Sequence, residues 1–132
     1  MEVRVITYGE ANKRVVHGEL SAEQLEFLEI QETGEAVQGR VNLPMNEIQM
    51  CFEFVAEAAS AGLIGAAARR AKDLFASLRR AQREDAVIDK IVIDDLPPRH
   101  MTLLTAREKD QILDELEREI LKRLSQQSTK PV

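Results

Sequence analysis

Few residues in this sequence have the types and spacing that catalysis or metal binding requires. The two histidines, His17 and His100, lie far apart in the chain and do not form the His-x-x-x-His spacing of a helical metal site. One group could meet across a hairpin and hold a divalent cation: Asp89, Asp94, Asp95 and His100. Acidic residues beside prolines more often serve turn geometry. We therefore expect no metal site.

The potential nucleophiles have structural explanations. Ser21 and Thr105 stand where helices are predicted to begin, so we interpret both as helix caps. Cys51 falls on an apolar stripe, which is typical of a buried structural thiol. The sequence contains neither a phosphate-binding loop nor a glycine-rich dinucleotide fingerprint. We expect no cofactor and no enzymatic activity.

Charge is the clearest pattern, because it is unevenly distributed. Residues 1–60 contain eleven acids against four bases, residues 61–85 carry a net charge of +3, and the remainder carries −1. Helical spacing gathers five bases on one face of the predicted central helix, and we take these as the candidate partner-binding residues: Arg69, Lys72, Arg79, Arg80 and Arg83. The alternatives are a solvated face, or a face that pairs internally with the acidic first third of the chain.

Length and composition indicate one small globular domain. The chain has 132 residues, which is one ordinary domain that needs neither disulfides nor metal to build a core. We assign residues 1–125 to this domain and 126–132 to a flexible polar tail. A single cysteine suits a reducing compartment, and the most apolar stretch, 58–68, is too short to span a membrane. We expect a cytoplasmic protein without membrane contact.

The first part of the chain is predicted to form strands and one short helix. Apolar and polar residues alternate over residues 2–8, and residues 14–17 are predicted to return as the second strand of a hairpin. A capping-box pattern at Ser21 favours a helix over 21–29, with a strand over 24–30 as the alternative. Residues 36–43 are predicted to form a third strand.

The central stretch is predicted to form two helices, over residues 46–60 and 65–83. Each has a single apolar stripe, but the two stripes are out of phase. Gly62 and Gly65 each weaken a helix interior, so we place a break between residues 60 and 65. A single bent helix is the alternative.

The last part of the chain is predicted to form a strand over 87–93, a loop at Pro97 and Pro98, a return strand over 101–104 and a helix over 105–125. The apolar stripe of this helix consists of Ile112, Leu113, Leu116, Ile120, Leu121 and Leu124. The fold class is therefore α+β. We predict a small antiparallel or mixed sheet, with a broken central helix pair and a C-terminal helix packed on one face.

One segment resembles a known nucleic-acid-binding family. Gly62-Leu63-Ile64-Gly65 lies between two predicted helices, and the order of elements over 36–125 resembles the KH domain, which binds single strands through a helix–GXXG–helix loop. The resemblance implies that the two glycines admit a nucleic-acid backbone. It also implies that the bases Arg69, Arg70 and Lys72 supply positive charge.

Two functions from different classes follow. The first is a non-enzymatic protein–protein interaction module, such as a small bacterial immunity, inhibitor or adaptor protein that binds through charged patches. The second is single-stranded nucleic-acid binding through the KH-like segment. The net charge of −5 favours the first, because phosphate neutralisation dominates nucleic-acid affinity. Another protein is the expected partner, and a second copy of the chain is an open alternative.

Overall fold

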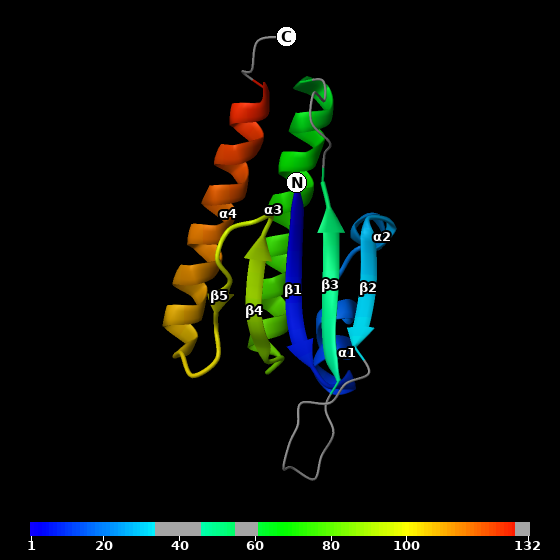
Figure 1. The fold of residues 1–132 in the computed structure, drawn as a ribbon, viewed down its shortest axis with the longest axis vertical. Coiled ribbons are helices and arrows are strands. Elements are labelled where there is room, and N and C mark those ends of the chain that lie inside the picture. Colours follow the sequence, from blue (N-terminus) through cyan, green and yellow to red (C-terminus); the bar gives the residue numbers. More distant parts are fainter. Residues whose placement is uncertain (34–45, 55–60, 129–132) are drawn as a thin grey trace.

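The structure is a computed structural model that describes residues 1–33, 46–54 and 61–128. Its elements follow the order β1–α1–α2–β2–β3–α3–β4–β5–α4 (Figure 1). The strands are β1 (Glu2–Tyr8), β2 (Leu28–Thr33), β3 (Glu47–Glu53), β4 (Ile88–Ile93) and β5 (Arg99–His100). The helices are α1 (Glu10–Gly18), α2 (Ala22–Glu26), α3 (Ala61–Arg83) and α4 (Ala106–Ser128).

The strands form one sheet with β1 at its centre. The order across the five-stranded sheet is β2-β3-β1-β4-β5, and every neighbouring pair is antiparallel. Strands β1 to β4 with their helices have the split β-α-β arrangement, to which β5 and α4 are added. The predicted α+β class is confirmed, and of the two sheet types left open the antiparallel one is present.

The two faces of the sheet have different surroundings. Successive side chains of a strand point to opposite faces, so Val3, Val5 and Thr7 of β1 share one face. This face packs on the helices: α3 and α1 lie behind the strands and α4 lies beside β5 (Figure 1). In the described part of the chain no helix covers the opposite face. We call this uncovered side the open face.

The core lies between the sheet and the two long helices. Leu74, Phe75 and Leu78 of α3 are buried against the sheet. The predicted stripe of α4 is confirmed, with four buried members and two partly buried ones: Leu113, Leu116, Ile120 and Leu124, then Ile112 and Leu121. Burying one such side chain stabilises the fold by about 1.5–3 kcal/mol.

The predicted helix over 46–60 is wrong where the structure describes it, because residues 47–53 form β3. Ile48, Met50 and Phe52 alternate onto the core face with the period of a strand. Cys51 points to the open face, yet it is only 5% exposed. Because Cys51 is apolar and lies on the face opposite the core, the sequence pattern resembled a helical stripe more than the alternation of a strand.

The predicted return strand over 14–17 is also wrong, because these residues belong to α1. The β-branched pair Val15 and Val16 favoured a strand, but packing decides otherwise: Val16 is fully buried in the core and Val15 packs against it. Gly9, with a φ of 85°, turns the chain from β1 directly into the helix.

Both alternatives for residues 21–30 are partly correct. The capping box is present: Gln24 N donates to Ser21 Oγ over 3.2 Å, and Ser21 N donates to Gln24 Oε1 over 2.8 Å. The resulting helix α2 ends at Glu26, and β2 begins two residues later. The third strand predicted over 36–43 lies outside the described residues.

The predicted break between residues 60 and 65 is wrong over its described part. Residues 61–83 form the single helix α3, and Gly62 and Gly65 lie inside its first turns. The helix–loop–helix geometry of a KH domain therefore does not exist at these glycines. Of the predicted pair, the helix over 65–83 is confirmed, with its start at Ala61.

The C-terminal part largely follows the prediction. Strand β4 and the proline loop are confirmed, but the return strand lies at Arg99–His100 instead of 101–104. The predicted cap at Thr105 is confirmed and forms a second capping box: Glu108 N donates to Thr105 Oγ1 over 3.1 Å, and Thr105 N donates to Glu108 Oε1 over 2.9 Å. Helix α4 extends to Ser128, so the first residues of the predicted tail are helical.

We predict that Gly65→Ala raises the free energy of unfolding by about 0.5–1 kcal/mol. Gly65 is exposed within α3, and a Cβ added there meets no atom within 4 Å. Denaturant melts give the measurement. Gly9→Ala is the contrasting variant: its positive φ is unfavourable for alanine, and we expect a loss of about 1–3 kcal/mol. A loss of stability in Gly65→Ala would show that α3 is not a regular helix at this position.

Candidate functional site

The structure divides the five predicted partner-binding residues into two groups. Arg79 lies between α3 and α4, where its Nη2 is 2.7 Å from Asp114 Oδ1 and 2.9 Å from Glu117 Oε1. Burial opposes its charge, but hydrogen bonds to Glu117 and Asp114 raise the pKa of Arg79. This arginine joins the two long helices.

Arg80 also has partners within the fold. Its Nη2 donates to Glu19 O over 3.3 Å and to Ser77 Oγ over 3.1 Å. Ser77 is buried and donates to Gln24 Oε1, which connects α3 with α2. Arg80 therefore extends a polar network that fixes the α1–α2 corner on α3, and it is not a free docking residue.

Arg69, Lys72 and Arg83 are exposed on α3 and have no ion pair among the described residues. Arg70, which the KH resemblance had added, stacks on Phe27 with its guanidinium carbon 4.2 Å from the ring centre, and its Nη2 donates to Phe54 O. The predicted basic face is thus reduced to three exposed cations without an ion pair among the described residues.

Of the four residues considered for a cation site, Asp94 has partners within the fold in the loop after β4. Asp94 Oδ1 accepts a hydrogen bond from Glu2 N over 2.8 Å, and Asp94 Oδ2 lies 3.5 Å from Arg123 Nη1. His17 is on α1 and His100 on β5. Among the described residues no group of three His, Cys, Asp or Glu side chains could hold a metal ion.

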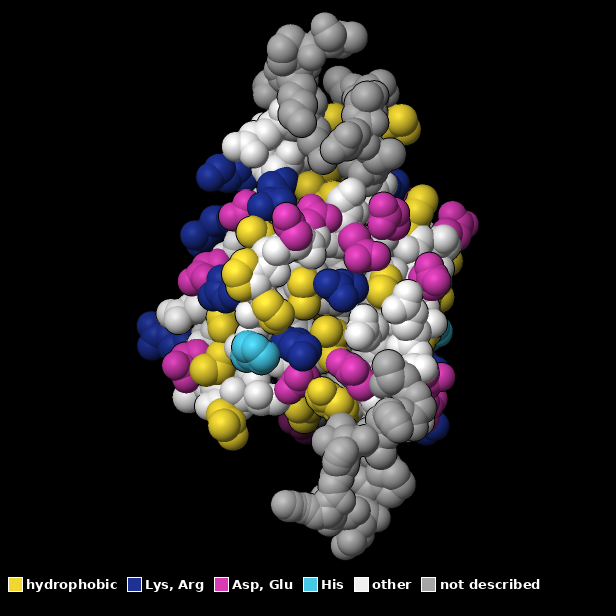
Figure 2. Space-filling model, viewed as in Figure 1, with side chains coloured by type: hydrophobic (Ala, Val, Ile, Leu, Met, Phe, Trp, Pro, Cys, Tyr) yellow, Lys and Arg dark blue, Asp and Glu magenta, His cyan; other side chains and the backbone are white. Residues whose placement is uncertain are grey.

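The sequence reasoning did not identify the open face of the sheet, which brings together outward residues of all five strands. Strand register defines its members: Glu2, Arg4, Ile6, Tyr8, Glu29, Gln31, Glu47, Gln49, Cys51, Glu53, Lys90, Val92 and His100. Figure 2 looks onto this face and shows acidic side chains gathered over the end where β1 begins. Acids outnumber the Lys and Arg residues among these members, so the face is net acidic.

Apolar side chains lie under the polar surface of the open face. Ile6 is 3% exposed, and Cys51 and Val92 are each 5% exposed. Arg4 is opposite both Cys51 and Val92 in the strand register, and its Nε is 3.5 Å from Glu2 Oε1. Long polar side chains therefore cover an apolar layer that a partner could reach by displacing them.

A hollow of about 360 Å³ opens at the acidic end of this face. Its lining consists of four carboxylates, two apolar residues and the thiol: Glu2, Glu26, Glu29, Glu53, Phe27, Leu28 and Cys51. We call it the acidic hollow. It forms where β2 and β3 end their pairing, since Glu53 N donates to Phe27 O over 3.3 Å just beyond the ladder.

The hollow is electrically negative. Burial raises the pKa of the Cys51 thiol, Glu2, Glu29 and Glu53 raise it further, and Arg4 acts in the opposite direction. At the other end of the face, burial followed by Glu47 and Asp89 raises the pKa of Tyr8. Both groups stay protonated at neutral pH, and a protonated thiol is a poor nucleophile.

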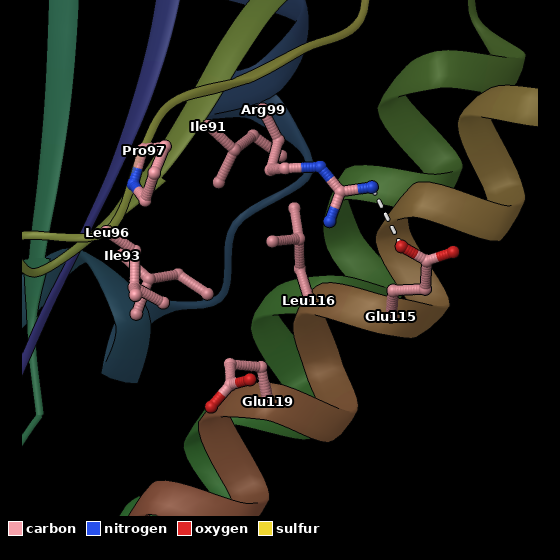
Figure 3. Close-up of a pocket in the computed structure, with 8 residues that line it drawn as sticks. All are labelled: Ile91, Ile93, Leu96, Pro97, Arg99, Glu115, Leu116 and Glu119. Carbon is pink, nitrogen blue, oxygen red and sulfur yellow. Dashed lines mark hydrogen bonds and ion pairs between the residues drawn. The ribbon is translucent and has the colours of Figure 1, made fainter.

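A second concavity, of about 320 Å³, lies between α4 and the loop after β4 (Figure 3). Ile91 and Ile93 lie on one side, and Leu116 reaches toward them from α4. Arg99 and Glu115 pair at its rim over 2.7 Å, and Glu119 pairs with Arg123 over 3.2 Å. Because these charges neutralise one another, the pocket offers an apolar surface without a polar group that would select an occupant.

No family model matches the chain, and comparisons with curated proteins and with solved structures found no similar protein. None of the described helices is long and apolar enough to cross a membrane. The split β-α-β arrangement supports many unrelated functions, so the function has to be argued from the surface of this chain.

We predict that Arg79→Glu lowers the free energy of unfolding by about 1–3 kcal/mol, because it removes two charge-assisted hydrogen bonds and places a third acid beside Asp114 and Glu117. Arg83→Glu is the matched control and should change stability by less than about 0.5 kcal/mol. Denaturant melts compare the two. Equal stability of both variants would mean that Arg79 does not join the helices.

We also predict that Glu29→Gln combined with Glu53→Gln lowers the pKa of Cys51, because removing two nearby negative charges favours the thiolate. The measurement is the rate of alkylation by iodoacetamide as a function of pH. The control removes two charges from the turn after α3, by Glu84→Gln with Asp85→Asn. An unchanged pKa in the first variant would contradict a negative potential in the hollow.

Proposed function

We propose that this protein is a non-enzymatic protein–protein interaction module that docks its partner on the open face of the sheet. The supporting observation is an apolar layer of Ile6, Cys51 and Val92 that no described helix covers, under a net acidic surface with a hollow at one end. A small immunity, inhibitor or adaptor protein would work in this way.

An uncovered face is not sufficient support by itself. Antiparallel sheets commonly expose one polar face to water, with apolar residues restricted to the other. Here the central strand has Ile6 on its outward side, with Cys51 and Val92 on the two strands beside it. These buried apolar side chains on the outward face and the concave acidic end are features of a recognition surface more than of a solvated one.

The basic face of α3 supports docking less well than sequence reasoning indicated. Arg79 and Arg80 have partners within the fold, which leaves Arg69, Lys72 and Arg83. If α3 bound nucleic acid, these three cations would neutralise only a few phosphates. The helix also has no glycine loop that could hold a nucleic-acid backbone. The open face itself is net acidic and would repel phosphate.

We further infer a reducing cytoplasmic setting for this module. Cys51 is a free and buried thiol. Unpaired cysteines of this kind are typical of proteins in compartments that keep thiols reduced.

The test places a photo-crosslinker at Gln31 and Gln49 on the open face and at Gln111 on α4, one position at a time. We expect Gln31→p-benzoylphenylalanine and Gln49→p-benzoylphenylalanine to give the same protein adduct in a lysate of the source cells. The control at Gln111, which is exposed and away from the face, should give none. Adducts at Gln111 alone would exclude the open face as the docking surface. A nuclease-sensitive adduct would favour nucleic acid as the partner.

A further inference from the structure

We propose that the partner of the open face is a basic protein segment, and that the acidic hollow seats one of its arginine side chains against Phe27. This inference rests on the proposed docking function. It adds the chemistry of the partner and the position at which the partner is anchored.

Charge complementarity is the first argument. Glu2, Glu26, Glu29 and Glu53 border the hollow, and Arg4 is the one base in the strand register beside it. Burial is the largest cause of the raised pKa of Cys51, and Glu2, Glu29 and Glu53 raise it further against the opposing effect of Arg4. Such a site attracts a cation and speeds association with a basic surface.

The aromatic wall is the second argument, and it favours arginine over lysine. Phe27 is 39% exposed and is the one aromatic residue among the exposed large hydrophobic residues of the described part of the chain. It lines the acidic hollow and also a smaller cavity that Arg70 lines too, and the Arg70 guanidinium stacks on the ring. Guanidinium groups stack on aromatic rings and bind carboxylates in a fork, which ammonium groups do not.

The size and position of the hollow fit one long side chain of a larger partner. A volume of about 360 Å³ is at the lower end of ligand pockets, and Leu28 with Phe27 provides apolar surface for the stem of an arginine. A second negative area, at Glu47 and Asp89 beside Tyr8, lies at the other end of β3, about 20 Å away at about 3.3 Å per residue. A partner with basic groups spaced over that length would contact both ends.

A second copy of the chain is a poorer occupant. If two open faces met, each net acidic surface would oppose another, and like charges would be brought together. A head-to-tail contact could instead place the exposed cations of α3 in the hollow of the next copy. The test below separates that arrangement from a foreign partner.

The probe is fluorescein-labelled nona-arginine, with nona-lysine for comparison, and binding is followed by fluorescence anisotropy in low salt. We expect Glu29→Gln with Glu53→Gln to weaken nona-arginine binding about tenfold. The matched control, Glu84→Gln with Asp85→Asn, removes the same charge elsewhere and should weaken it less than twofold. Phe27→Leu should weaken the binding of nona-arginine by a larger factor than the binding of nona-lysine. Thermal melts check that each variant folds.

A second measurement uses the wild-type protein and so does not depend on any variant folding. Nona-arginine should slow the alkylation of Cys51, whereas nona-glutamate should not, because the thiol lines the hollow. Equal loss of binding in the hollow and control variants, or no protection of Cys51, would overturn the proposal. Self-association in sedimentation that Arg83→Glu abolishes would overturn it in favour of a second copy.

The outcomes also separate this inference from the function on which it rests. If nona-arginine fails to bind but crosslinks at Gln31 and Gln49 persist, the open face is an interface and the partner chemistry is wrong. If those crosslinks are absent as well, both proposals fail.

Discussion

The arrangement of this protein depends on the direction of its two crossover connections. The chain passes from β1 to β2 through α1 and α2, and from β3 to β4 through α3, each time crossing over one intervening strand. In each case the two connected strands run parallel to each other, and crossover connections between parallel strands are right-handed almost without exception. The two crossovers run in opposite directions, so the same handedness places their helices on the same side of the sheet. The open face is a direct consequence of this constraint.

The elements predicted correctly are those whose signals are local. Both capping boxes act over three residues, and β4 is rich in β-branched side chains. Helix α4 carries its whole apolar stripe within one continuous segment. Each of these patterns can be recognised without knowing what the element packs against, which explains why they agree with the structure.

The errors come from residues whose environment is set by distant parts of the chain. Cys51 is buried on the face away from the helices, which concealed the alternation of β3. Arg79 and Arg80 looked free because their partners, Asp114 and Glu19, are 35 and 61 residues away in sequence. The acidic excess in the first sixty residues was the one available signal for the hollow. Only the pairing of β1, β2 and β3 converts that excess into a surface.

The central position of β1 has a consequence for the order in which the protein can assemble during synthesis. Strand β1 pairs with β4, where Val3 is opposite Ile93, so this pairing waits until β2, β3, α3 and β4 have also been made. Such distant pairings slow folding, and an unpaired strand edge is a site of aggregation. A nascent chain that stops before Ile88 exposes the core strand of the sheet along one side. Until β4 has been made, the side of β1 that will pair with it is therefore open to pairing with other chains.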